Sequence, residues 1–214
     1  MNIIIVGIHT GIGKTVCSAI MIEALEYDYW KPVQAGDLHA TDSMFVQKHT
    51  GNTRTKIHDE KYRLAVAASP HWAAELEGVA IDFDEMILPS TDNGLIIETA
   101  GGVMSPLNAT QTNLDLIGHF NLPVILVCND YLGSINHTLL SIEALRREGV
   151  QIMGLVFCGE EVKSTRDYIL SYSKLPMLFS IPRFETLDEI ILCSFAASIS
   201  STLKKSIDEF CPKR

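Results

Sequence analysis

A glycine-rich segment near the N-terminus holds the residues best suited to chemistry. Residues 7–15 read Gly-Ile-His-Thr-Gly-Ile-Gly-Lys-Thr. Glycines let backbone N–H groups converge on one anion without Cβ clashes. A lysine adds positive charge for the β- and γ-phosphates, and a threonine hydroxyl can bind Mg²⁺. The segment therefore predicts a loop that cradles a triphosphate through Lys14 and Thr15.

The elements on either side of this segment support the prediction. Residues 2–6 are an apolar run of strand formers, and apolar residues recur at helical spacing over 16–25. A strand, a glycine-rich turn and a helix form the layout of a phosphate-binding loop, because the helix N-terminus favours an anion. The spacing departs from the common form, since five residues rather than four separate Gly7 from Gly13. The alternative is a glycine-rich turn with an incidental lysine.

A carboxylate ends the apolar segment Leu95-Ile96-Ile97-Glu98, and a glycine pair follows at Gly101-Gly102. This is the Walker-B arrangement with Glu in place of Asp. Its carboxylate could bind Mg²⁺ directly or through water, and the glycine pair would let the backbone approach the γ-phosphate. The alternative is a strand-terminal Glu on the surface, which the loop at residues 7–15 disfavours.

Lys31 and Asp42 are weaker candidates on their own segments. Lys31 follows the strand-like residues 27–30 and precedes Pro32. Functional residues of open α/β sheets lie just past the carboxyl ends of strands, so Lys31 is either placed to reach a ligand or is a solvated edge lysine. Asp42 precedes a predicted helix over 44–49, where it either caps or begins the helix or binds a metal. The residues alone leave both questions open.

Strand and helix signals alternate over the rest of the chain. They predict one α/β domain over residues 1–214, with a mostly parallel sheet and helices on both faces. Residues 51–66 are polar and are expected to be irregular. Ser134 is expected to cap a helix whose core stripe is Ile135, Leu139 and Ile142. The other predicted helices are 69–75, 82–88, 113–120, 162–172 and 186–210, and the other strands are 123–128, 151–158 and 177–181.

Composition narrows the class of protein. The chain has 214 residues, a hydrophobic fraction of 47% and a net charge of −9, as expected for a soluble globular protein. No Lys/Arg cluster suits a nucleic-acid backbone, and no apolar run approaches the ~20 residues of a membrane span. The N-terminus lacks the basic region of a signal peptide, so we expect a cytoplasmic protein. The five scattered cysteines form no Cys-x-x-Cys pair, which favours reduced thiols over a zinc site.

With these segments in hand, the chain resembles dethiobiotin synthetase, the ATP-dependent enzyme of biotin synthesis. Read backwards from Thr15, the loop is similar to the variant phosphate loop shared by partition ATPases, the nitrogenase iron protein and dethiobiotin synthetase. The resemblance covers nearly the whole chain. It rests on ordered blocks: residues 7–15, Lys31-Pro32-Val33 with Gly36, Asp42, Glu98 with Ala100-Gly101-Gly102, residues 123–127, Leu132-Gly133 with Ile135-Asn136-His137, and Ile181-Pro182.

The resemblance implies a cyclo-ligase reaction. 7,8-Diaminononanoate captures CO₂ as a carbamate, ATP phosphorylates the carbamate to a carbamic-phosphoric anhydride, and the second amine closes the cyclic urea. ADP and phosphate are the other products. The resemblance also implies a homodimer, with no nucleic acid or membrane as partner.

Matching residues suggest roles in that reaction. Lys31 and Lys14 would be catalytic, and the resemblance resolves the choice left open for Asp42 by grouping it with Thr15 and Glu98 around Mg²⁺. The substrate would contact Thr10, Lys31, Ala35, Gly102 and, across the dimer interface, Asn136. The nucleotide would contact Gly11, Ile12, Gly13, Lys14, Thr15, Val16, Asp42, Glu98, Gly101, Cys158, Gly159, Pro182, Arg183, Phe184 and Glu189.

Several positions depart from the family pattern. His9 replaces the acid usual in the loop, and Ala35 stands where many members have a substrate-binding Ser. Cys158-Gly159 replaces the Asn-Asp pair that reads adenine, so we expect weak selectivity for the base. The main alternative is a nucleotide-dependent switch like the partition ATPases, but that class has a lysine where this chain has His9. A cobyrinic acid amidotransferase would need a further glutaminase domain, and a Ser hydrolase would need a Gly-x-Ser-x-Gly segment that is absent.

Overall fold

A parallel sheet forms the centre of the molecule. The computed structural model describes residues 1–210, and its main sheet has seven strands in the order β4-β2-β6-β1-β7-β8-β9. Every neighbouring pair of strands in it is parallel, as predicted. The strands are β1 (Asn2–Gly7), β2 (Asp28–Trp30), β4 (Ile57–His58), β6 (Leu95–Gly102), β7 (Val124–Asn129), β8 (Ile152–Cys158) and β9 (Met177–Ile181).

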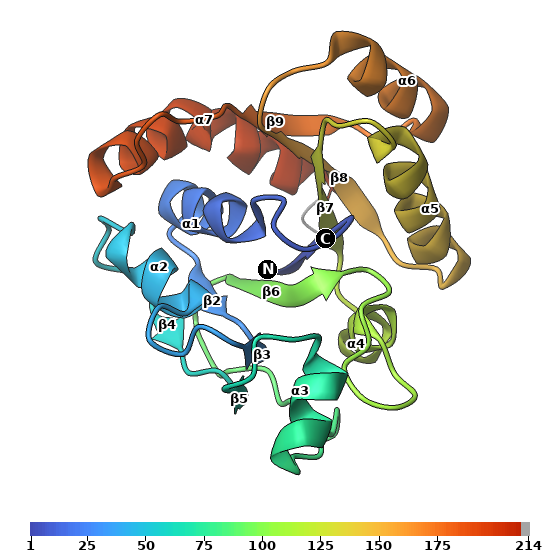
Figure 1. Cartoon of the computed structure of the whole chain (residues 1–214). Helices are drawn as coiled ribbons and strands as arrows, with labels where there is room; N and C mark the ends of the chain where they lie inside the picture. Colours follow the sequence, from blue (N-terminus) through green and yellow to red (C-terminus); the bar gives the residue numbers. More distant parts are fainter. Residues whose placement is uncertain (211–214) are drawn as a thin grey trace.

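Helices cover both faces of this sheet, which confirms the predicted fold class. In Figure 1, α1 and α7 lie together on one side of the sheet, and α4 and α5 lie on the other. Helix α7 packs along α1, and α6 packs along α5. The helices are α1 (Lys14–Leu25), α2 (Asp42–Lys48), α3 (Pro70–Glu77), α4 (Asn113–Phe120), α5 (Ser134–Arg147), α6 (Lys163–Ser173) and α7 (Glu189–Phe210).

The core lies along β1 and its neighbours. Residues 3–6 of β1 and 124–128 of β7 are buried along their whole length. A parallel strand covered on both faces needs continuous apolar residues, and both segments supply them. Residues 19–22 of α1 are buried as well, because α1 is covered by the sheet on one side and by α7 on the other.

Helix α7 is the one helix within residues 1–210 that is long and apolar enough, by length and composition, to cross a membrane. Its buried residues recur at helical spacing: Leu192, Ala196, Leu203 and Ile207. One face of α7 therefore belongs to the core of the domain.

The stretch 51–66 is more ordered than the sequence predicted. It contains β4 and a further strand, β5 (Tyr62–Leu64), which pairs with β3 (Val33–Ala35) in a separate two-stranded sheet. Lys31 and Pro32 lie between the main sheet and this small sheet. Because Pro32 has no N–H to donate to a ladder, the chain leaves the main sheet there.

The predicted helix over 82–88 is wrong. The segment forms a single turn, in which the Met86 N–H donates to the Phe83 carbonyl at 2.9 Å. Ile81, Phe83 and Met86 are all buried. Inside the predicted helix, Phe83 and Met86 are three apart, a spacing that suits one helix face as well as a single turn, which is why the pattern misled the prediction.

The predicted cap and core stripe of α5 are also partly wrong. Ser134 is the first helical residue, and Gly133, at φ 102°, precedes it as the cap. Ile142 is buried as predicted, but Ile135 and Leu139 are only half-buried. The side of α5 that faces the sheet consists of Ser134, Thr138, Ser141, Ile142 and Leu145. Apolar spacing misled the prediction because small polar residues occupy much of the buried side.

Candidate active site

The glycine-rich loop joins β1 directly to α1, as its sequence predicted. Gly13 is the cap of α1 and has a left-handed backbone at φ 98°. A Cβ on Gly13 would lie 2.9 Å from the Cys158 Sγ atom, so no larger residue fits without displacement. The Lys14 ammonium donates to the His9 carbonyl at 3.2 Å, which folds this side chain over the loop. The loop thus places backbone N–H groups, a helix N-terminus and a lysine together.

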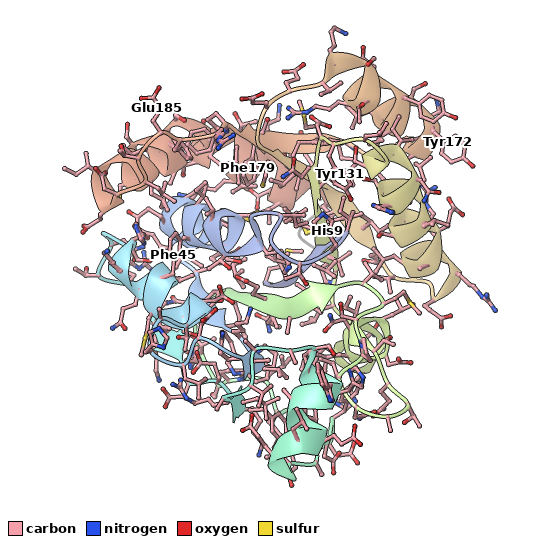
Figure 2. The ribbon with its side chains drawn as sticks, in the orientation of Figure 1. His9, Phe45, Tyr131, Tyr172, Phe179 and Glu185 are labelled. Atoms are coloured by element: carbon pink, nitrogen blue, oxygen red, sulfur yellow. The ribbon has the colours of Figure 1, made fainter. Side chains whose placement is uncertain are left out.

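His9 extends the loop toward α5. Its ring packs edge-on against Tyr131, with ring centroids 5.4 Å apart (Figure 2). The Tyr131 hydroxyl in turn lies 2.6 Å from the His137 Nδ1 atom in α5. The phosphate loop and the start of α5 are therefore in contact through aromatic side chains.

Two carboxylates meet at the first turn of α1. The Thr15 Oγ1 atom lies 2.8 Å from Asp42 Oδ1 and 2.8 Å from Glu98 Oε1. A threonine hydroxyl has one hydrogen, so it can donate to only one of these oxygens at a time. The other Glu98 oxygen accepts hydrogen bonds from Ser18 Oγ at 2.8 Å and Tyr29 Oη at 3.1 Å. Glu98 is 1% exposed and is held by hydrogen bonds from two elements, α1 and β2.

Lys31 completes this cluster. Its Nζ atom lies 2.5 Å from Asp42 Oδ2 and 3.3 Å from Glu98 Oε1. Burial acts to lower the pKa of Lys31, but the Glu98 and Asp42 carboxylates outweigh it and the net pKa is raised. Lys31 therefore stays charged across the physiological range. Of the two roles that the sequence left open for Lys31, the solvated edge lysine is excluded, because the side chain is 5% exposed.

The pKa values of Asp42 and Lys14 are also shifted, by burial and by the charged groups around them. Burial acts to raise the pKa of Asp42, but Lys31 and the Thr15 hydroxyl outweigh it and lower the pKa. Burial lowers the pKa of Lys14 to about 8, against the opposing effect of Glu98. Asp42 also begins α2, and Thr41 is the cap, accepting from the Met44 N–H at 3.2 Å. Asp42 is thus both a first-turn helix residue and a member of the cluster.

These residues border a cavity of about 640 Å³, here called the main cavity. Most of the predicted phosphate and substrate residues line it, whereas Gly102 lies just behind the wall and donates its N–H to Ser105 Oγ at 2.8 Å. The lining residues are Thr10, Gly11, Gly13, Lys14, Thr15, Val16, Lys31, Gln34, Ala35, Asp37, Ala40, Asp42, Ala67, Ala68, Ser69, Pro70, Glu98, Ala100, Gly101 and Ser105.

A second cavity of about 500 Å³, here called the base cavity, lies on the other side of the loop. Most of the residues predicted to flank a nucleobase line this cavity, and residues of the glycine-rich loop line it as well. Its lining residues are Gly11, Ile12, Gly13, Val16, Asn129, Asp130, Cys158, Gly159, Glu160, Ile181, Pro182, Arg183, Phe184 and Leu187.

Two predicted site residues lie elsewhere. Glu189 lines neither cavity, and its Oε1 atom lies 3.4 Å from where a Cβ would stand on Gly51. Asn136 is exposed on α5 and borders a groove between α5 and α6. That groove shares no lining residue with the main cavity, so the structure does not bring Asn136 together with the other predicted substrate residues.

Three polar residues of the site were missed from the sequence. Ser18 and Tyr29 hold Glu98, and Asn129 lines the base cavity. Ser18 follows Lys14 by one helical turn, and Asn129 ends a central strand, so their positions were available as signals. Tyr29 lies inside a strand and offered none.

The donor set of the cluster fits Mg²⁺. Magnesium prefers oxygen ligands, and three oxygens converge at Thr15, Asp42 and Glu98, where a single hydroxyl hydrogen faces two carboxylates. Within residues 1–210, no group of three or more His, Cys, Asp and Glu side chains could hold a metal. The oxygen donors of Thr15, Asp42 and Glu98 are those that Mg²⁺ prefers, whereas softer metals favour thiolate and imidazole ligands.

The sequence is similar to known enzymes over most of its length. Residues 1–190 match a family model described as an AAA domain. The ATP-dependent dethiobiotin synthetase BioD of Christiangramia forsetii is 43% identical over 93% of this chain and 96% of its own length. The enzyme of the same name from Rhodopseudomonas palustris (strain BisB18) is 43% identical over 87% of this chain and 90% of its own length.

Solved structures agree on the fold. The cell division ATPase MinD of Pyrococcus furiosus superimposes with a TM-score of 0.67 at 15% identity, covering 98% of this chain and 99% of that one. The septum site-determining protein MinD of Pyrococcus horikoshii, solved with Mg-ADP, has a TM-score of 0.60 at 17% identity, covering 99% of this chain and 98% of that one. At these identities the likeness concerns the fold alone.

The main sheet is parallel, a glycine-rich loop precedes α1, a lysine and a threonine begin that helix, and an acid lies within the neighbouring strand β6. Together these features define a P-loop protein of the NTPase type. The sequence relatives narrow this class. The chain belongs to the ATP-dependent dethiobiotin synthetase family.

Proposed function

We propose that this protein is an ATP-dependent ligase of the cytoplasm that joins 7,8-diaminononanoate and CO₂ to form dethiobiotin, ADP and phosphate. The observation that carries the proposal is the convergence of Lys31, Thr15 and Glu98 on one cavity beside the phosphate loop. The family relatives, which carry this activity in their names, support it.

The glycine-rich loop would bind and align the phosphates of ATP. Backbone N–H groups of Gly11 to Thr15 would hold the phosphates, and Lys14 would neutralise the γ-phosphoryl group as it moves. Thr15, Asp42 and Glu98 would hold Mg²⁺, which when bound neutralises phosphate charge. The protein needs no covalent intermediate, because phosphoryl transfer depends mainly on alignment and charge neutralisation.

Lys31 and the part of the cavity wall next to it would bind the substrate. One amine of the substrate adds to CO₂ and loses a proton, which gives a carbamate. The carbamate oxygen attacks the γ-phosphorus and ADP leaves. The second amine then attacks the carbonyl carbon of the resulting anhydride, and phosphate leaves as the ring closes. Lys31 would hold the anionic carbamate near the phosphates, because its ammonium is buried at the junction of both subsites.

Contacts to the substrate would come from Thr10 and the segment around Ala35. Ala35 has no hydroxyl, and the Gln34 side chain beside it instead donates to the Gly36 carbonyl at 3.0 Å. The Gln34 Oε1 atom is 3.4 Å from the Asp42 N–H. Gln34 therefore stiffens this wall, and we propose that backbone groups of residues 34–36 replace the missing hydroxyl.

A homodimer would complete the site. Leu132 is fully exposed just before α5, and Tyr168 of α6 is 53% exposed and lines the same groove as Asn136. Apolar side chains exposed beside one another are typical of protein interfaces. Pairing of two copies through this face would bring Asn136 of each to the substrate carboxylate of the other.

The test is an assay of ADP release with purified protein. We expect turnover only when the diamine, bicarbonate, ATP and Mg²⁺ are all present. Lys31→Ala should abolish turnover while the variant keeps its circular dichroism spectrum. Comparable ADP release without the diamine would instead favour a nucleotide-dependent switch of the partition-ATPase type, the alternative that the shared fold leaves open.

A further inference from the structure

The base cavity has an unusual wall where strands β7 and β8 end. Cys158, the last residue of β8, and Gly159, which follows it, are two of the residues expected to contact the base. Burial raises the pKa of the Cys158 thiol to about 12, so it is a neutral and weak hydrogen-bonding group. Gly159 has no side chain, and its backbone is left-handed at φ 88°. The end of β8 therefore supplies no strong side-chain partner for a base.

The neighbouring strand supplies one. Asn129 is the last residue of β7, pairs in register with Cys158, and lines the base cavity. Its amide lies over Gly159, with Oδ1 3.4 Å and Nδ2 3.8 Å from the position that a Cβ on Gly159 would occupy. The absence of a side chain on β8 thus leaves room for the amide of β7.

The following residue, Asp130, anchors the backbone next to Asn129. Asp130 Oδ2 accepts from Arg166 Nε at 2.5 Å and from the Val162 N–H at 3.1 Å. Arg166 is buried, and it also donates to the Gly159 carbonyl at 3.4 Å. The ends of β7 and β8 and the start of α6 are therefore tied together behind the cavity, which holds the backbone that carries Asn129 in place.

We propose that Asn129 recognises the nucleobase of the bound nucleotide. Its amide offers one acceptor and one donor, which matches an adjacent amino group and ring nitrogen on adenine. The loop residues that would hold the phosphates, Gly11 to Gly13, line the same cavity, so a base attached to those phosphates can enter it. The proposal rests on nucleotide binding by the proposed enzyme and adds the residue that contacts the base.

Calorimetry with ADP and with pyrophosphate, each with Mg²⁺ and without the diamine, tests it. Asn129→Ala removes the amide, and Asn129→Leu removes the polar atoms but keeps the volume. We expect both variants to weaken ADP binding about tenfold, the effect of losing one or two hydrogen bonds. Pyrophosphate has no base, so its affinity should stay within about twofold. Asn2→Ala, at the opposite end of β1 from the loop, is the matched control and should bind both ligands like the wild type.

Three results would overturn the proposal. They are unchanged ADP affinity in both Asn129 variants, retained ADP affinity in Asn129→Leu alone, and an equal loss of pyrophosphate affinity. The second would mean that packing, not hydrogen bonding, is what the cavity needs, and the third that the loop is distorted. Because no diamine is used, a base-specific loss remains measurable even if diamine-dependent turnover is never found.

Discussion

The hydroxyl of Thr15 and the carboxylate of Glu98 lie 2.8 Å apart, although 83 positions separate them in the chain. The contact joins the first turn of α1 to the interior of β6, the strand beside β1 in the sheet. It brings a potential magnesium ligand from each element to the edge of the main cavity. This contact makes Glu98 the most informative position for mutation.

Glu98→Gln should lower turnover by about 100-fold or more, because one charge that would hold Mg²⁺ is removed. The amide keeps the shape of the side chain, so the circular dichroism spectrum should not change. The Mg²⁺ concentration for half-maximal rate should also rise, which a purely structural effect would not cause. The control is Glu75→Gln, an exposed position on α3. Near-normal turnover in Glu98→Gln would contradict the assigned role.

Lys14 should take up a proton when phosphates bind at alkaline pH. Burial lowers its pKa to about 8, so the free protein at pH 8.5 has this amine mostly neutral. Bound phosphates favour the charged form and raise the pKa, so binding takes up as much as about one proton. Calorimetry of ADP binding in buffers with different ionisation enthalpies measures this uptake.

Lys14→Arg is the control for that experiment, because a guanidinium stays protonated at pH 8.5 whether or not phosphate is bound. Proton uptake should therefore disappear in this variant. An equal uptake by the wild type and Lys14→Arg at pH 8.5 would rule out Lys14 as the source.

Asp28 should make folding stability sensitive to acid. This buried carboxylate accepts hydrogen bonds from Asn93 Nδ2 at 2.9 Å, Thr91 Oγ1 at 2.7 Å and the Lys56 N–H at 3.0 Å. Burial acts to raise the pKa of Asp28, but these donors outweigh it and the net pKa is lowered. The stability that Asp28 contributes is therefore fully present above its unfolded pKa, near ~3.9, and is lost as pH falls through the lower folded value.

Asp28→Asn should cost about 2–3 kcal/mol of unfolding free energy at pH 7, since the charge and part of the hydrogen bonding are lost. The cost should shrink at pH 3.5, where the wild type begins to lose the same contribution. Urea denaturation at the two pH values measures both costs. A cost that does not depend on pH would mean that the charge of Asp28 is not what stabilises the fold.

Mixed dimers would show whether two chains share each site. Lys31→Ala and Asn136→Ala should each be inactive as homodimers. In a mixed dimer, one of the two sites combines an intact Lys31 with an intact Asn136 of the other chain. Random mixing in equal amounts should therefore restore about a quarter of wild-type activity. No recovery after subunit exchange, with exchange verified by mass spectrometry, would exclude the shared site.

The parts of the site that the sequence predicted are those set by local pattern or by sheet topology. The strand, loop and helix around Gly13 are contiguous in the chain, so their residues are sufficient to predict them. The strand-end rule made Lys31 a candidate to reach a ligand, but the residues alone left a solvated edge lysine equally open, and its contact with Glu98 is seen only in the structure. The family resemblance was needed to add Asp42.

The parts that could not be predicted depend on partners distant in sequence. Strand β5 has only three residues, and it forms because Val33–Ala35, about thirty positions earlier, lies beside it. Likewise, Asn129 ends a central strand, where site residues gather, but nothing local to it indicates which ligand it would contact. Its significance depends on Gly159, which leaves space across the strand pair.

The small sheet of β3 and β5 has a consequence for how this enzyme can change. A Cβ on Gly36 would lie 2.7 Å from the Ala67 Cα atom, so the two backbones pack directly against each other there. Residues 34, 35, 67 and 68 of this region line the main cavity. The small sheet is separate from the seven-stranded sheet that carries the phosphate loop. Mutations there can reshape what the pocket accepts while the machinery that handles phosphate is left intact.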